Sequence, residues 1–295
     1  MSIKLDLYRV FCSVAGHRSF SGAARELYMT QPAVSQAIMQ LEDQLGIRLF
    51  TRMPRGVTIT NEGQLLYEYI SSAMNLIKVG EQKLLEAKDL LIGELKVGVG
   101  DTISRYFLLP YLERFHSESP GIKLRIINRT TLELCEMLKS GEIDMAICNL
   151  PVDEPAFEIM ELKRIHDIFV CGDKYIHLTE NPPDLTQIVK YPLILLESKS
   201  NSRQYVEKYF MSLDIKITPE IELGSHELLL EFAKINLGIA CVIKEFSQEY
   251  LQRGVVHEIR VAEGIPPRSI GCCFLKSVSL SPASKRFVDI LKPVL

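Results

Sequence analysis

Short polar side chains fill residues 29–38, MTQPAVSQAI, where a helix buried on all sides would carry bulkier ones. Glutamine amides can pair with the N6 and N7 edge of adenine in the major groove of DNA, and small serines let a helix axis come close to the bases. Thr30 can cap the helix, and Pro32 in its first turn loses nothing because its missing N–H would have no intrahelical partner. An ordinary solvated helix face would carry the same residue types. The candidate DNA contacts of this helix are Thr30, Gln31, Pro32, Ser35, Gln36 and Gln40.

The elements on either side of this helix favour the DNA-reading interpretation. Apolar residues recur at helical spacing over 5–17 and again over 20–28, so three short helices follow one another. Only a few residues join the second helix to the third, which is typical of a helix-turn-helix. Two short β-prone runs within 45–60 then predict a wing-like hairpin. The arginines on or near it, suited to phosphate contacts, are Arg48, Arg52 and Arg55.

Residues 19–63 resemble the DNA-binding signature of the LysR-type transcriptional regulators. The QPAVSQ core, the LE..LG..LF.R run and the T..G at the start of the next helix carry the resemblance, which continues in layout to the C-terminus. It implies a winged helix-turn-helix, a dimerising linker helix and a two-lobed α/β effector domain similar to periplasmic solute-binding proteins. The expected domains are therefore 1–60 for DNA binding, 61–91 for dimerisation and 92–295 for the effector.

Composition and charge agree with a multidomain globular chain that binds DNA at one end. The chain has 295 residues, of which 47% are hydrophobic and 24% charged. Residues 1–58 hold seven Lys or Arg and four Asp or Glu, a net charge of +3, whereas the whole chain carries −3. A basic head on an acidic body suggests that only the head meets nucleic acid. No leader-like N-terminus or membrane-length apolar run is present, so we expect a cytoplasmic protein with no membrane partner.

A heptad-like seam runs along residues 62–91. Its apolar positions alternate between spacings of four and three, a pattern that outlasts the average globular helix. We expect two such helices to pair, giving a homodimer or homotetramer that binds an interrupted inverted repeat of double-stranded DNA. The alternative is a helix packed on its own domain. The predicted dimerisation residues are Leu66, Ile70, Ala73, Ile77, Leu84 and Leu91.

From Gly93 onward, strand-like and helix-like runs alternate, which predicts an α/β domain with a mostly parallel sheet in each lobe. By resemblance, lobe I covers 93–162 plus 268–295 and lobe II covers 163–267, so the chain crosses between the lobes twice. Open α/β sheets bind ligands beyond the carboxyl ends of their strands, where helix starts present unpaired N–H groups. The expected binding site therefore lies between the lobes.

Hydroxyl and amide side chains occupy the predicted strand ends. As helix caps they would need no further role, but four such loops, two in each lobe, favour a shared polar cleft. The resemblance places Thr102, Thr130 and Ser202 where family members commonly touch their effector. The candidate effector contacts are Thr102, Ser104, Asn128, Thr130, Asn149, Ser200, Ser202 and Ser225.

The expected ligand is a small polar anion such as a carboxylate. Hydroxyls and helix-start amides are donors whose dipoles favour negative charge. Arg105, Arg129 and Arg203 lie within a few residues of these loops, and a guanidinium can clamp a carboxylate with two hydrogen bonds. His226 is the histidine nearest the predicted cleft, either as an effector contact or as a plain first-turn residue.

Other functional classes find less support in the sequence. It carries no Gly-rich phosphate loop, nucleophile elbow or HExxH motif, and its six histidines show no metal-ligand spacing, so we expect neither an enzyme nor a metal or cofactor site beyond the small-molecule co-inducer. Seven cysteines lie mostly in apolar segments, which favours buried thiols. Two alternatives stay open: a redox-responsive regulator, and a solute-binding module without a regulatory role. RNA polymerase is a candidate partner of a transcriptional regulator.

Overall fold

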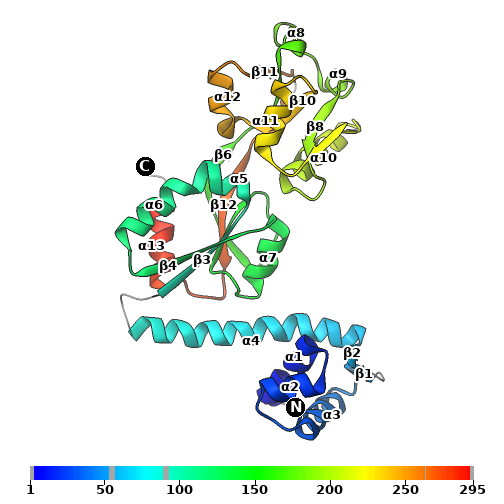
Figure 1. The fold of residues 1–295 in the computed structure, drawn as a ribbon, viewed down its shortest axis with the longest axis vertical. Coiled ribbons are helices and arrows are strands. Elements are labelled where there is room, and N and C mark those ends of the chain that lie inside the picture. The colour runs from blue at the N-terminus through cyan, green and yellow to red at the C-terminus, as the bar shows by residue number, and fades with distance from the viewer. Residues whose placement is uncertain (1–2, 53–56, 89–92, 263, 293–295) are drawn as a thin grey trace. The chain divides into compact units, whose positions relative to one another are not determined.

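The computed structural model describes residues 3–52, 57–88, 93–262 and 264–292, drawn as ribbon in Figure 1. The chain forms two compact units, residues 1–88 and 89–295, which we call the N-terminal unit and the C-terminal unit. Each is described by itself.

The N-terminal unit begins with three helices around a small apolar core. They are α1 (Leu5–His17), α2 (Phe20–Glu26) and α3 (Gln31–Leu45). Thr30 caps α3 as predicted, because its hydroxyl accepts a hydrogen bond from the Ala33 amide. Val34, Ile38 and Leu41 turn one face of α3 into the core, which leaves the opposite face free. The short connection between α2 and α3 and the orientation of α3 confirm the predicted helix-turn-helix arrangement.

A buried carboxylate joins α3 to the hairpin of β1 (Phe50–Arg52) and β2 (Val57–Ile59). Glu42 is 5% exposed, and its side chain accepts from the backbone amides of Leu49 at 2.7 Å and Phe50 at 3.1 Å. The exposed Arg48 donates to the other carboxylate oxygen at 2.8 Å. The carboxylate therefore satisfies the donors of the turn that follows α3 and fixes where the hairpin begins.

A threonine and a glycine attach the next helix, α4 (Asn61–Lys88), to the same turn. The Thr60 hydroxyl donates to the Arg48 carbonyl at 2.9 Å and accepts from the Gly63 amide at 3.0 Å. A Cβ on Gly63 would lie 2.3 Å from the Leu49 carbonyl oxygen, so this close approach requires glycine. The T..G pattern at residues 60–63 is thus a packing requirement.

The start of α4 packs on the core of the N-terminal unit through Leu66 and Tyr67. Further along, the helix exposes large apolar side chains: Ile77 is 42% exposed and Leu84 is 72% exposed. Ile70 is half-buried and Ala73 is exposed, whereas Leu91 lies outside the described residues. Exposed apolar side chains along one face of a helix are typical of a surface that packs against another helix.

The C-terminal unit consists of two lobes, each built on a five-stranded sheet (Figure 1). Lobe I has the strand order β4-β3-β5-β12-β6, in which β3 runs parallel to β4 and β5 while β12 runs antiparallel to β5 and β6. Its strands are β3 (Gly93–Val99), β4 (Ile122–Asn128), β5 (Met145–Asn149), β6 (Phe157–Ile165) and β12 (Arg268–Leu275). Its helices are α5 (Asp101–Ile103), a π-helical turn (Ser104–Leu108), α6 (Leu109–Glu118), α7 (Thr131–Lys139) and α13 (Pro282–Leu291).

Lobe II has the strand order β11-β7-β10-β8-β9, in which β8 runs parallel to β9 and β10 while β7 runs antiparallel to β10 and β11. Its strands are β7 (Asp167–Cys171), β8 (Leu193–Leu196), β9 (Ile221–Leu223), β10 (Ile239–Ile243) and β11 (His257–Ile259). Its helices are α8 (His177–Glu180), α9 (Leu185–Ile188), α10 (Asn201–Ser212), α11 (His226–Lys234) and α12 (Gln248–Gln252), with 3₁₀ turns at Asp173–Tyr175 and Lys244–Phe246.

The chain crosses between the lobes twice, through β6 into β7 and back into β12 (Figure 1). The strand β6 continues to Ile165, so the first crossing falls at His166, a few residues later than the expected end of the lobe I segment at 162. Each sheet is mixed, because β12 in lobe I and β7 in lobe II run antiparallel to both of their neighbours. The other four strands of each sheet share one direction, but only three of them pair in parallel, so the expectation of mostly parallel sheets holds for those three. The helix expected after β3 is broken by the π-helical turn.

Candidate effector cleft and DNA-reading face

A polar cleft of about 410 Å³ opens between lobe I and lobe II. It lies at the carboxyl ends of β3, β4, β5, β8 and β9, the place that an α/β sheet offers to a ligand. The lining includes six of the eight predicted effector residues: Thr102, Asn128, Thr130, Asn149, Ser200 and Ser202. Ser104 and Ser225 do not belong to the lining, although each lies beside a lining residue in the sequence.

Several of these polar side chains already have protein partners. Thr130 caps α7 in a reciprocal box with Glu133, donating from Oγ1 to Glu133 Oε2 at 2.7 Å. These bonds lower the pKa of the Glu133 carboxyl. Asn128 donates to the Ser104 hydroxyl at 3.1 Å. By contrast, Ser200 and Ser225 precede α10 and α11 without making a side-chain cap, so the first N–H groups of these two helices have no cap from those hydroxyls.

A buried arginine ties the two lobes together at the base of the cleft. Arg268 is the first residue of β12 and is 5% exposed. It donates to both carboxylate oxygens of Asp167, at 2.6 and 2.9 Å. It also donates to Asn149 Oδ1 at 2.8 Å and to the Ser202 hydroxyl at 2.9 Å. Two of the predicted effector contacts, Asn149 and Ser202, are therefore positioned by Arg268, a residue that the sequence analysis did not single out.

A second set of contacts joins the lobes nearer the surface. Arg105 of lobe I forms a two-pronged ion pair with Glu227 on α11 of lobe II. Next to it, the Tyr106 ring stacks on Phe246 with ring centroids 5.4 Å apart, and meets the edge of the His226 ring at 5.5 Å.

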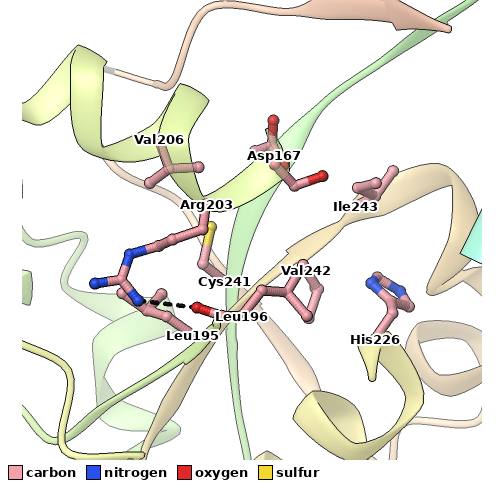
Figure 2. A pocket seen from close by; sticks show the side chains of 10 residues that line it. Asp167, Leu195, Leu196, Arg203, Val206, His226, Cys241, Val242 and Ile243 are labelled. Carbon is pink, nitrogen blue, oxygen red and sulfur yellow. Dashed lines mark hydrogen bonds between the residues drawn. The ribbon is translucent and has the colours of Figure 1, made fainter. Parts of the chain in front are cut away.

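The three arginines proposed to clamp an anion lie in different surroundings. Arg105 is held by Glu227, as just described. Arg203 is buried and turns into lobe II, where it donates to the Leu196 carbonyl at 2.9 Å and to Glu207 at 2.6 Å (Figure 2). Arg129 lines the cleft, and Lys199 adds a second cation there. Of the three arginines proposed as clamps, Arg129 lines the cleft, whereas helix direction and nearby carboxylates place Arg105 and Arg203 elsewhere.

Acidic side chains also reach the cleft. Asp101, Glu133 and Glu197 belong to its lining together with Arg129 and Lys199. Glu133 is engaged by the α7 cap, which occupies one of its carboxylate oxygens. The cleft therefore offers charges of both signs. Where a charged ligand binds depends on which helix N-termini it contacts.

His226 lines both the cleft and a small chamber of about 20 Å³ in lobe II. Figure 2 shows the side chains that line the chamber. The imidazole is 3% exposed, and its burial together with the nearby Arg268 charge lowers its pKa to about 4. The ring is accordingly neutral near pH 7. The chamber shares Leu196, Ser202, His226 and Ile243 with the cleft.

The seven cysteines are all free thiols, and every one except the half-buried Cys12 is buried. Burial raises the pKa of Cys12 and of Cys171 to about 11, and it also raises the pKa of Cys241 and Cys272. Cys135 differs, because a hydrogen bond with Cys148 lowers its pKa. Thiolates are the reactive form, so raised pKa values make four of these thiols poor redox groups.

The predicted DNA contacts occupy the free face and the start of α3. Gln31, Pro32, Gln36 and Gln40 are exposed, Ser35 is half-buried and Thr30 is the cap. Arg52 ends β1, and Arg55 lies outside the described residues. Tyr28, which the sequence analysis did not propose, is 98% exposed in the turn between α2 and α3, with a left-handed backbone at φ 54°. A bulky residue in that conformation is unusual and marks this turn as a candidate contact surface.

Known proteins match the chain over nearly its full length. The family described as "LysR substrate binding domain" matches residues 88–295, and "Bacterial regulatory helix-turn-helix protein, lysR family" matches residues 5–64. The chain belongs to the LysR family. It is a DNA-binding transcriptional regulator with an effector-binding domain, as the sequence analysis predicted.

Individual relatives are distant, and the full-length ones cover nearly the whole chain. The RuBisCO operon transcriptional regulator of Allochromatium vinosum is 26% identical, over 99% of this chain and 96% of its own length. Full-length OxyR of Pseudomonas aeruginosa, in a variant form, shares the fold with a TM-score of 0.68 at 22% identity, covering 99% of this chain and 94% of its own. The effector-binding domain of QuiR, solved in complex with shikimate, matches 68% of this chain and 95% of its own, with a TM-score of 0.60 at 21% identity.

The described part of this LysR-family chain shows neither a metal-binding cluster nor a membrane-spanning helix. Residues 3–52, 57–88, 93–262 and 264–292 contain no group of three or more histidine, cysteine or acidic side chains placed to hold a metal ion. Within the same residues, every helix is too short or too polar to cross a membrane.

The buried Arg268 predicts a specific pattern of stability. Arg268→Met is expected to lower the free energy of unfolding by about 3–5 kcal/mol, because the Asp167 carboxylate would stay buried without a partner. The double variant Arg268→Met with Asp167→Leu should recover most of this loss, since no charge remains buried. Arg105→Met, at the exposed ion pair, should lower the stability far less than Arg268→Met, because solvent screens the pair. Urea unfolding followed by circular dichroism measures all three; equal losses in the single and double Arg268 variants would contradict this account.

Proposed function

We propose that this regulator reads its target sequence with the exposed face of α3. The observation that carries the proposal is that Gln31, Gln36 and Gln40 are solvent-exposed on the helix whose opposite face is fixed in the core. Uncharged amides make hydrogen bonds that depend on the base, whereas arginines on the wing meet phosphates whatever the sequence. Arg52, the last residue of the wing strand β1, is the proposed source of such a charge.

Two substitutions distinguish sequence-specific recognition of DNA from non-specific binding to its phosphates. Gln36→Ala should cost about 1–3 kcal/mol of discrimination between the target and a variant site, with little change in binding to unrelated DNA. Arg52→Ala should weaken binding to all sequences alike and lower the slope of log affinity against log salt by about one. Footprinting and gel-shift titrations at several salt concentrations measure both. If the glutamine variant behaved like the arginine variant, the reading face would be assigned wrongly.

We propose that α4 joins two copies of the chain, so that two heads bind an interrupted inverted repeat as a dimer or as a pair of dimers. The support is the exposed apolar seam, in which Ile77 and Leu84 face solvent on a helix of 28 residues. Pairing would bury these side chains against their counterparts.

Dimerisation through α4 can be tested by placing one charged side chain in the apolar seam. Ile77→Asp should dissociate the dimer, because two carboxylates would face each other in an apolar contact. Lys78→Asp, one residue further along the same helix, is the matched control and should leave the mass unchanged. Sedimentation of the two variants decides the question. An unaltered mass for Ile77→Asp would mean that association rests on other surfaces.

We propose that the effector is a small carboxylate bound in the cleft without being converted. The support is that α10 and α11 both start at the cleft without a side-chain cap, so their first N–H groups and dipoles are available to an anion. Lys199 and Arg129 line the same space. Shikimate, which the QuiR domain binds, is such a carboxylate. The cytoplasm, where DNA and RNA polymerase both lie, is the proposed location.

Calorimetry with a panel of central carboxylic acids tests this proposal. One of them should bind, and Lys199→Ala and Thr102→Val should each weaken it about 10-fold, as expected for loss of one hydrogen bond to a charged group. Ser198→Ala, exposed and outside the cleft lining, is the control that should change nothing. Binding of a polyamine or an apolar hydrocarbon in place of every carboxylate would overturn the anion assignment.

A further inference from the structure

We propose that the cleft selects a hydroxy acid: a carboxylate whose neighbouring hydroxyl donates a hydrogen bond to Nδ1 of His226. The inference rests on the proposed function, since it takes the carboxylate effector in the cleft as given. It adds a second recognition element, and with it the chemical class of the effector.

The neutral ring of His226 has one nitrogen that donates a hydrogen bond and one that accepts. Its pKa of about 4 leaves the ring neutral near pH 7, and a neutral imidazole carries a single N–H. The ring begins α11, is 3% exposed and belongs to the lining of the cleft.

The second step assigns the proton to Nε2. Ser247 is fully buried, and its hydroxyl donates its only hydrogen to the Ile243 carbonyl at 2.8 Å. Nε2 of His226 lies 3.3 Å from the hydroxyl oxygen of Ser247. Because that hydroxyl has already given its hydrogen to Ile243, its oxygen can only accept from Nε2. Nε2 therefore carries the hydrogen, and Nδ1 carries a lone pair. The positive end of the α11 dipole favours a lone pair over an N–H at this helix start.

The third step is that this lone pair lacks a protein donor. No hydrogen bond described for residues 93–262 or 264–292 uses Nδ1 of His226. The ring is held between Tyr106 and Phe246, with centroids 5.5 and 6.1 Å away, so it cannot swing out to solvent. Among the described residues, Nδ1 of His226 is not one of the fully buried polar atoms without a partner, so it is open to the cleft, where a ligand hydroxyl can donate to it in place of water.

The fourth step concerns which donor fits. An ionised carboxylate only accepts, so it cannot satisfy Nδ1. An ammonium group could donate, but the Arg268 charge, which already acts on His226, and the two helix starts disfavour a second cation. A neutral hydroxyl next to the carboxylate meets neither objection. The cleft should therefore prefer a hydroxy acid to the matching deoxy acid and to the matching amino acid.

The experiment uses sets of acids that differ at one group. Calorimetry on the full-length protein compares malate with succinate and aspartate, lactate with propionate and alanine, and shikimate with cyclohexene-1-carboxylate. In any set that binds, the hydroxy acid is expected to bind up to about 10-fold tighter than the deoxy acid. Equal affinity within a set would overturn the inference while leaving the carboxylate proposal intact. Failure of every acid to bind would overturn both.

Two substitutions at His226 distinguish its acceptor role from simple packing. In His226→Gln the amide can reach the position of Nε2 and keep the contact with Ser247, but nothing remains at Nδ1, so the preference for the hydroxyl should disappear. In His226→Asn the amide oxygen takes the place of Nδ1, so the preference should persist. A preference unchanged in His226→Gln would contradict the inference.

A measurement on the unaltered protein guards against variants that fail to fold. Nitrogen NMR of histidine-labelled protein should show the His226 ring protonated at Nε2, with the Nδ1 resonance moving when a hydroxy acid is added and staying when the deoxy acid is added. A ring protonated at Nδ1 would overturn the inference.

Discussion

The C-terminal unit depends on one buried ion pair, between Arg268 and Asp167. Each residue stands at the start of a strand that follows a crossing, so the pair fastens the two points where the chain passes between the lobes. Burying two charges is costly unless all their hydrogen-bonding groups find partners. Asn149 and Ser202 complete the set, one from each lobe. The base of the cleft is therefore rigid, and the polar groups that a ligand meets there are already oriented.

The contacts nearer the surface differ in kind from this pair. Arg105 and Glu227 have side chains that are 55% and 38% exposed, and an ion pair so open to solvent contributes little to stability. The two lobes are thus joined strongly at the base and weakly at Arg105. A ligand whose affinity for one conformation of the lobes is greater by a few kcal/mol would shift the population towards that conformation without breaking the buried pair. Such a difference in strength between two interlobe contacts is what a regulator needs in order to respond to small molecules.

Local patterns allowed much of the fold and of the cleft to be predicted from the sequence. The cap at Thr30, the three-helix head and the six predicted polar residues that line the cleft follow from spacing, turn chemistry and the rule that ligands lie at strand ends. Arg268 was missed because its partner Asp167 lies 101 residues away, and an arginine after two prolines looks exposed in the sequence. Arg203 was misjudged for a related reason: proximity to a loop says nothing about where a long side chain points once a helix fixes its direction.

The N-terminal unit shows how the residues of the family signature divide between structure and recognition. Glu42, Thr60 and Gly63 hold the wing and α4 to the end of α3 through buried hydrogen bonds and one close backbone approach. These residues would be required whatever DNA sequence is bound. The exposed amides of Gln36 and Gln40 have no comparable structural duty. The family signature therefore combines residues that build the head with exposed amides such as Gln36, which lies in the QPAVSQ core and is free to meet DNA.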